Sequence, residues 1–206
     1  PMLYPTEGYQ RYTPARPDWD AVNALVRLID DAVSPVIMAG NGVMAANAGV
    51  ALQALAERAG IVVASSYNAK GVVAETSEIA VGMLGTWGSP TANRAVAGAD
   101  LVVMIGASMG PDYTRFRDSA LIRPGEQTLV QVDVDPRNAG WVYPVDIAIT
   151  GDAADVITMM DEIGLSVTSR EMRLEAIAEL KARTGYDEFP RPTAQQGFLH
   201  HADLVA

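Results

Sequence analysis

Residues 34–43, SPVIMAGNGV, decide the fold class of this chain. The stretch is a short apolar run that ends in Gly40-Asn41-Gly42, and a helical pattern through ALQALAERAG (residues 51–60) follows it. An apolar run without polar alternation is typical of a strand that is buried on both faces, as in a parallel sheet between helices. Gly60 is well placed to end the helix.

Four further apolar runs have the same character: IVVASS (61–66), ADLVVMIGA (99–107), TLVQVDVDP (128–136) and VDIAITGDA (145–153). Helical patterns accompany them at 18–32, where Asp18 is the expected cap, and at about 90–98 and 153–163. A strongly amphipathic helix is expected in SREMRLEAIAELKARTG (169–185). Alternation of this kind predicts an open α/β sheet wound in the right-handed sense.

Composition excludes several classes of function. The 206 residues are 49% apolar and 19% charged, with 15 Lys and Arg against 25 Asp and Glu and a net charge of −10. Without a basic stripe, that balance argues against a nucleic acid or an anionic membrane as partner. Cysteine is absent from the sequence, which excludes disulfides, thiolate metal sites and a cysteine nucleophile. We find no secretory signal, and the uncharged residues 32–56 are too polar to span a membrane, so we expect a cytoplasmic protein.

Glycines and acids follow the ends of several predicted strands. The pair Gly40 and Gly42 could admit a pyrophosphate at a helix N-terminus, although Ala45 replaces the third glycine of G-x-G-x-x-G. A tight turn without a ligand explains the pair equally well. Asp133 could accept hydrogen bonds from a ribose or stabilise the turn before Pro136, and Asp152 could cap a helix or contact a ligand. Because open α/β sheets bind ligands at this edge, the cluster favours a nucleotide-sized site.

We find no catalytic motif. G-x-S-x-G, H-E-x-x-H and Walker sequences are absent, and the two histidines, His200 and His201, lie in the tail. Lys70 and the three arginines of the loop after ADLVVMIGA (Arg115, Arg117 and Arg123) could meet an anionic ligand, but solvated loop positions explain them as well. The sequence therefore predicts binding features, with no catalytic residue and no metal ligand.

Six segments together resemble the central domain of thiamine-diphosphate-dependent enzymes of the acetolactate synthase, pyruvate oxidase and benzoylformate decarboxylase group. They are PVIMAGNGV, LAERAGIVVASSYNAKG, VGMLGTWGSPTAN, GADLVVMIGA, LVQVDVDP and VDIAITGDA, and the resemblance covers about residues 18–163. It implies a three-layer α/β/α fold with a six-stranded parallel Rossmann-like sheet in the order 3-2-1-4-5-6. It also implies a short third strand at about 80–84, followed by a loop and a helix that is capped near Ser89-Pro90.

The resemblance also implies a domain organisation. Residues 1–17 would be a linker arm, 18–164 the central nucleotide-binding-like domain, and 165–206 a C-terminal helix and linker toward a pyrophosphate-binding domain. A pyrimidine-binding domain would lie on the amino side. We therefore expect a piece of a longer, homo-oligomeric (dimeric or tetrameric) 2-oxo acid decarboxylase or carboligase that uses thiamine diphosphate and magnesium. Gly151-Asp152-Ala153 is not the family's GDG cofactor motif, so the piece alone is expected to be inactive.

In relatives that use it, this domain binds FAD or another adenine nucleotide. The positions that match the flavin-contacting residues are Gly40, Gly42, Ser66, Leu84, Gly85, Thr86, Trp87, Gly106, Asp133, Val134, Asn138, Asp152 and Ala153. Flavin-binding relatives carry an arginine two residues beyond the glycine of the fourth strand, where this chain has Ser108, and Asp112 replaces a second arginine. FAD, another adenine nucleotide and an empty site therefore remain as alternatives.

Two functions of other classes also remain. The glycine turn and Asp133 would suit a stand-alone NAD- or FAD-binding module, and the fold would suit an oligomerisation scaffold. Flavin absorbance or tight NAD binding would favour the first of these two.

Overall fold

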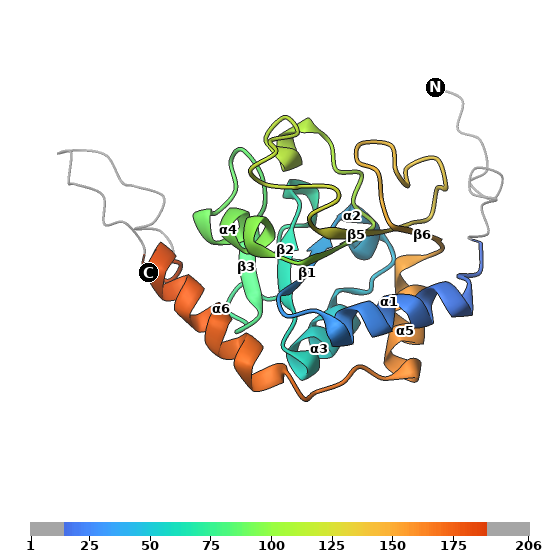
Figure 1. Cartoon of the computed structure of the whole chain (residues 1–206), viewed down its shortest axis with the longest axis horizontal. Coiled ribbons are helices and arrows are strands. Elements are labelled where there is room, and N and C mark those ends of the chain that lie inside the picture. Colours follow the sequence, from blue (N-terminus) through green and yellow to red (C-terminus); the bar gives the residue numbers. More distant parts are fainter. Residues whose placement is uncertain (1–14, 189–206) are drawn as a thin grey trace, which may run out of the picture.

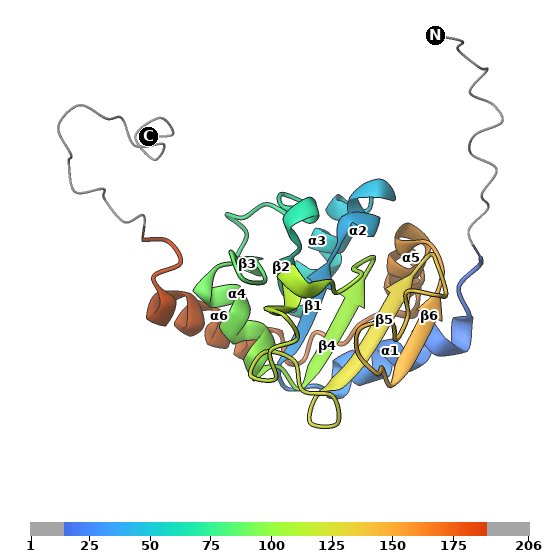
Figure 2. The ribbon, with the colours of Figure 1, turned by 90° about the horizontal axis from the view of Figure 1, so that it is seen from above.

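Six parallel strands form one sheet in the order β3-β2-β1-β4-β5-β6 in the computed structural model, which describes residues 15–188 (Figures 1 and 2). The strands are β1 (Pro35–Ala39), β2 (Val62–Ser65), β3 (Ala80–Met83), β4 (Leu101–Ile105), β5 (Thr128–Asp133) and β6 (Ile147–Thr150). The expected strand order, the parallel pairing and the short third strand are confirmed.

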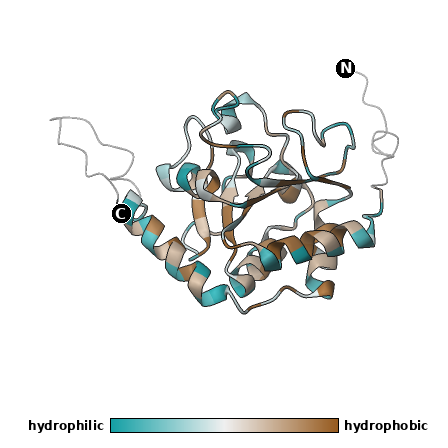
Figure 3. Ribbon diagram, viewed as in Figure 1, coloured by the Kyte–Doolittle hydropathy of each residue, from teal (hydrophilic) through white to brown (hydrophobic). Residues whose placement is uncertain are grey.

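Burial follows the position of each strand in the sheet. Every residue of β1 and β4, which pair at the centre of the sheet from Pro35–Leu101 to Ala39–Ile105, is buried. β6 lies at one edge, and Ala148 on it is exposed. The apolar run of β6 therefore differs from the others, because only one neighbouring strand and one helical layer cover it. Figure 3 shows the hydrophobic strands at the centre and hydrophilic segments on the outer helices.

Helices cover both faces of the sheet. They are α1 (Trp19–Asp31), α2 (Asn41–Ala45), α3 (Gly49–Ala59), α4 (Pro90–Gly98), α5 (Ala153–Ile163) and α6 (Arg170–Thr184), with short 3-10 turns η2 (Tyr67–Ala69) and η3 (Pro111–Thr114). α5 contacts α1 and α3 on one side, whereas α4 contacts β2, β3 and α6 on the other (Figure 1). The long loops after β4 and β5 complete the second layer. Within residues 15–188 no helix is long and apolar enough to cross a membrane.

The predicted helix ends are confirmed by their caps. The Asp18 carboxylate accepts from Ala21 N at 2.9 Å, and the Ser89 hydroxyl accepts from Ala92 N at 2.9 Å ahead of Pro90. Gly60 ends α3 with φ +66°, a left-handed conformation that glycine adopts without a steric penalty. The sequence pattern alone located the ends at Asp18 and Gly60, because these ends are determined locally. The cap near Ser89-Pro90 was implied by the family resemblance.

The helix expected through residues 51–60 is confirmed as α3. A short helix, α2, precedes it, and Asn47 between the two adopts a left-handed φ of +52°. α6 forms as expected, and it packs Ile177, with the partly buried Leu174 and Leu180, against the core. Arg173 is buried beside this apolar stripe, although the pattern assigns a charged residue to the solvent face.

Arg173 joins α6 to the ends of two other helices. Its guanidinium donates to Ile29 O at 2.7 Å and Ala32 O at 2.6 Å at the end of α1, and to Ala59 O at 3.3 Å at the end of α3. Helix C-termini leave carbonyl groups without intrahelical donors, and a cation there is favourable. Burial lowers the pKa of Arg173, but these contacts hold the buried side chain in place.

The turns that follow β1 and β4 touch at the centre of the sheet's carboxyl edge. Gly42 N donates to Gly106 O at 3.0 Å, and a Cβ built on Gly42 would lie 2.6 Å from Gly106 Cα. A Cβ on Gly40 would lie 2.1 Å from Gly106 O, and Gly106 itself has φ +58°. These glycines are therefore required by the contact between the two turns, whether or not a ligand binds.

We expect Gly42→Ala to lower the free energy of unfolding of the 206-residue chain by about 1–3 kcal/mol, the usual penalty of overpacking. Gly98→Ala is the matched control, because Gly98 ends α4 and an added Cβ meets no atom within 4 Å. The control should be neutral or stabilising by less than about 1 kcal/mol. Urea denaturation measures both variants, and equal effects would contradict the proposed close contact.

We expect Arg173→Met to lower the free energy of unfolding by about 2–5 kcal/mol, because buried carbonyl oxygens at the ends of α1 and α3 lose charged donors. Arg27→Met, at an exposed position of α1, removes the same charge and should change the free energy by less than about 0.5 kcal/mol. A loss of similar size in both variants would show that net charge, and not helix capping, explains the effect.

Candidate functional site

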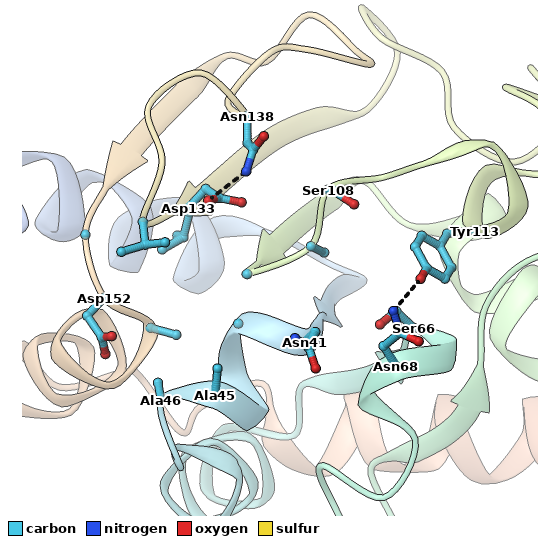
Figure 4. Close-up of a pocket in the computed structure, with 17 residues that line it drawn as sticks. Asn41, Ala45, Ala46, Ser66, Asn68, Ser108, Tyr113, Asp133, Asn138 and Asp152 are labelled. Carbon is cyan, nitrogen blue, oxygen red and sulfur yellow. Dashed lines mark hydrogen bonds between the residues drawn. The ribbon is translucent and has the colours of Figure 1, made fainter. Parts of the chain in front are cut away.

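A cavity of about 340 Å³ opens at the carboxyl edge of the sheet, beside the contact between the turns after β1 and β4 (Figure 4). It is lined by Asn41, Gly42, Ala45, Ala46, Ser66, Asn68, Gly106, Ala107, Ser108, Tyr113, Val132, Asp133, Val134, Asn138, Gly151, Asp152 and Ala153. Its volume lies near the lower end of the range of about 300–1,000 Å³ for small-molecule pockets. A cavity thus lies at the edge of the sheet where the sequence predicted a nucleotide-sized site.

Asp133 is the most deeply placed charged group of the cavity. It ends β5 and is 7% exposed, and its Oδ1 accepts from Asp135 N at 2.9 Å and from Asn138 Nδ2 at 3.2 Å. With these hydrogen bonds Asp133 stabilises the turn that follows β5, which is one of the two roles expected from the sequence. They also fix the carboxylate against the cavity wall, where Figure 4 shows Asn138 directed toward it.

Asp152 provides the second carboxylate. Its Oδ1 accepts from Ala154 N at 2.8 Å, so it is the N-cap of α5, and the first residue of that helix, Ala153, is buried beside it. An N-cap side chain satisfies a backbone donor that the helix leaves free. The same donor is therefore not offered to a ligand.

Eight of the expected positions line the cavity, namely Gly42, Ser66, Gly106, Asp133, Val134, Asn138, Asp152 and Ala153. Gly40 lies behind the turn against Gly106, and Leu84 is fully buried in the core. Gly85, Thr86 and Trp87 are also not among the lining residues. The structure thus divides the expected set into two parts.

η3 and Tyr67, the first residue of η2, separate the cavity from the loop that follows β3. Thr86 N donates to Asp112 O at 3.0 Å, and a Cβ on Gly85 would lie 2.3 Å from the same oxygen. The rings of Tyr67 and Tyr113 pack edge to face with centroids 5.1 Å apart, and Asn68 Nδ2 donates to Tyr113 Oη at 3.2 Å. The chain's own residues therefore stand between the cavity and the loop after β3.

Trp87 is 78% exposed on the far side of this partition, and its backbone N donates to Tyr67 Oη at 2.9 Å. Sequence reasoning did not identify Asn41, Asn68 and Tyr113 as cavity residues. Asn41 stands inside the glycine turn and could have been noticed there. Asn68 and Tyr113 have no such local signal, because contacts between segments 45 residues apart bring them together.

The cations that could have met an anionic ligand are engaged elsewhere. Lys70 Nζ pairs with Glu75 at 2.6 Å, Arg115 with Asp118 at 3.5 Å and Arg123 with Glu126 at 2.8 Å. Arg117 lies 5.8 Å above the ring of Tyr143, a buried phenol whose pKa is raised by burial. None of these residues lines the cavity.

Arg137 is the cation closest in sequence to Asp133, and Asp135 holds it. Arg137 Nε lies 2.9 Å from Asp135 Oδ1, and Arg137 Nη2 lies 2.6 Å from Asp135 Oδ2. Hydrogen bonds from Arg137 lower the pKa of Asp135 to about 2. This paired arginine does not reach the cavity, which is lined by two carboxylates and by no Lys, Arg or His.

FAD does not fit this arrangement well. No Lys, Arg or His of the described residues lines the cavity to pair with its diphosphate, and the partition of Asp112 and Tyr113 separates the cavity from the Gly85–Trp87 positions that the resemblance matches to flavin contacts. Within residues 15–188 no group of three or more His, Asp or Glu side chains could hold a metal ion.

Comparison with known proteins gives the family. A family model described as "Thiamine pyrophosphate enzyme, central domain" matches residues 22–160. The chain is 34% identical over 176 residues to a probable acetolactate synthase large subunit of Methanocaldococcus jannaschii, covering 84% of this chain and 29% of that protein. It is 33% identical over 178 residues to the acetolactate synthase large subunit of Corynebacterium glutamicum, covering 82% of this chain and 28% of that protein.

A sulfoacetaldehyde acetyltransferase of Alcaligenes xylosoxydans xylosoxydans is 32% identical over 167 residues, covering 79% of this chain and 28% of that protein. The chain thus spans less than a third of the length of these relatives. The sheet order, the carboxyl-edge cavity and these similarities agree, and the chain belongs to the family of thiamine pyrophosphate enzymes, of which it contains the central domain.

Proposed function

We propose that this chain is the structural core of a longer enzyme that uses thiamine diphosphate and magnesium to decarboxylate or ligate 2-oxo acids. The observation that carries the proposal is the match of residues 22–160 to the central-domain model. Relatives named acetolactate synthase and sulfoacetaldehyde acetyltransferase support a reaction in which carbon–carbon bonds are made or broken on a thiamine cofactor. The cofactor would supply that chemistry, and other domains of the parent would hold it.

In the parent enzyme, the central domain would act as a rigid scaffold for the other domains. Its core is a sheet whose two central strands are entirely buried, and buried close-packed elements transmit position with little deformation. Its helix ends are fixed by Asp18, Ser89 and Asp152. Such a body can set the relative positions of the pyrimidine- and pyrophosphate-binding domains that we propose as its partners within one subunit.

Three exposed aromatic residues mark the surface at which we propose that these domains dock. Trp87, Phe116 and Trp141 are 78%, 72% and 79% exposed. Their loops are joined through the contact of Thr86 with Asp112 and the stacking of Arg117 on Tyr143. Large aromatic side chains on one rim are typical of surfaces that another protein surface covers.

The rim also has a strained backbone. Arg115, Phe116 and Arg117 have consecutive φ values of +50°, +59° and +63°, which non-glycine residues rarely adopt. Thr114, which is fully buried, holds this turn, because its Oγ1 donates to Gly110 O at 3.1 Å and accepts from Arg117 N at 3.2 Å. Strain that is held by a buried contact is characteristic of functional segments, which supports a docking role for this loop.

We expect the 206-residue chain to form no acetolactate from pyruvate when thiamine diphosphate and magnesium are supplied. The reason is that the chain spans less than a third of the length of its relatives, and within residues 15–188 no group of three or more His, Asp or Glu side chains could hold a metal ion. The full-length parent, assayed with and without thiamine diphosphate, is the control and should depend on the cofactor. Product formation by the chain alone, or by the parent without the cofactor, would contradict the proposal.

A further inference from the structure

A second cavity, of about 200 Å³, lies at the amino edge of the sheet, in the groove between α4 and α6. Figures 1 and 2 show these two helices side by side. Thr91 Oγ1 of α4 and Thr184 Oγ1 of α6 lie 2.5 Å apart and join them. The groove shares no lining residue with the carboxyl-edge cavity, so it is a separate site.

The floor and walls of this groove are largely apolar. They include Pro35 and Val36 at the start of β1, Val62 at the start of β2, Ala95 on α4, and Ile177 and Leu180 on α6. Val33 extends the apolar wall to the surface, where it is 65% exposed. A Cβ on Gly98 would meet no atom within 4 Å, so the groove is open beside the end of α4. The apolar part of a ligand would therefore be removed from water here, which favours binding.

The charged side chains of the groove are all positive. Among the described residues that line it are Arg94, Arg173 and Arg183, and no Asp or Glu. Arg173 is 5% exposed, and its Nη atoms donate to the carbonyl groups that end α1 and α3, so it adds a fixed positive charge. Burial lowers the pKa of Arg173, and the charges of Asp30 and Asp100 oppose this effect. Neither of these two acids lines the groove.

Arg94 and Arg183 differ from most cations of the molecule. Ion pairs engage Arg58, Lys70, Arg115, Arg123, Arg137 and Arg170. The side chains of Arg94 and Arg183 are exposed, and neither has a hydrogen bond or an ion pair with any residue of 15–188. Arg183 lies in the last turn of α6, where a cation is favourable, but that position leaves its donors free. Two unpaired guanidinium groups on adjacent helices, above one apolar floor, can together meet a carboxylate.

We propose that the groove between α4 and α6 binds a small aliphatic carboxylate. Its carboxylate group would meet Arg94 and Arg183, and its hydrocarbon part would lie on the apolar floor. The volume of about 200 Å³ is below the range of about 300–1,000 Å³ for drug-sized ligands, so the molecule must be small. The site lies at the edge of the sheet that the proposed function does not use. A failure of the acetolactate assay would leave it intact, and its own failure would leave the proposed reaction intact.

Titration of the 206-residue chain with hexanoate, acetate, hexanamide and inorganic phosphate, followed by amide NMR shifts at constant ionic strength, tests the proposal. Hexanoate should bind with a dissociation constant on the order of 1 mM, because so small a molecule makes few contacts. Acetate and phosphate lack the hydrocarbon part and hexanamide lacks the charge, so each should bind at least about tenfold more weakly. The amides that shift should lie on α4, α6 and the start of β1.

Arg94→Gln and Arg183→Gln should each weaken hexanoate binding at least about fivefold, because each removes charged donors from the carboxylate. Arg27→Gln is the matched control. Arg27 is exposed on α1 and does not line the groove, so the change should alter the affinity by less than about twofold.

A second pair of variants adds a charge to α6. Ala176→Glu places a carboxylate in the wall of the groove and should weaken hexanoate binding at least about fivefold, because like charges repel. Ala178→Glu, at an exposed position of the same helix outside the groove, should change it by less than about twofold. Absence of hexanoate binding, binding of acetate, phosphate or hexanamide as tight as that of hexanoate, or equal losses in a variant and its control would each overturn the proposal. Shifts confined to the carboxyl-edge cavity would also overturn it.

Discussion

The contact between the turns after β1 and β4 is the constraint on which the carboxyl edge of this domain depends. Gly42 N donates to Gly106 O, and Gly40 lies against the same carbonyl with no room for a Cβ. In the order 3-2-1-4-5-6, successive connections run in opposite directions from β1 and β4, so the turns there would ordinarily part and leave a crevice. Here the two backbones meet, and the cavity beside them is lined by residues at the ends of β1, β2, β4, β5 and β6.

This arrangement gives a familiar sequence pattern a different physical cause. A glycine pair after the first strand usually allows a pyrophosphate to approach the backbone. In this chain Gly42 and Gly106 allow the backbone to approach itself. In the described part of the chain the cavity is lined by no Lys, Arg or His, and the partition made by Asp112 and Tyr113 separates it from the loop after β3.

The sequence predicted the features that are determined locally or by strongly apolar runs. The buried strands and the helix ends at Asp18 and Gly60 are of this kind, and the grouping of glycines and acids at one edge follows from parallel strands. β3 and the cap near Ser89 were expected only from the family resemblance. The burial of Arg173 could not be predicted, because a helical pattern assigns arginine to the solvent face, and its partners lie on α1 and α3. The Asn68–Tyr113 contact is equally long-range. It lies between the cavity and Trp87, which was expected in the site and does not line the cavity.

The central claim is that this member of the family has a carboxyl-edge site that works without a flavin dinucleotide. The most direct test is the flavin content of the full-length enzyme, purified without added cofactor, measured by absorbance and by release of the cofactor on denaturation. The account predicts less than about 0.1 flavin per subunit, and an activity that FAD does not increase, since the predicted affinity for FAD is weak. One FAD per subunit, retained through purification, would contradict it.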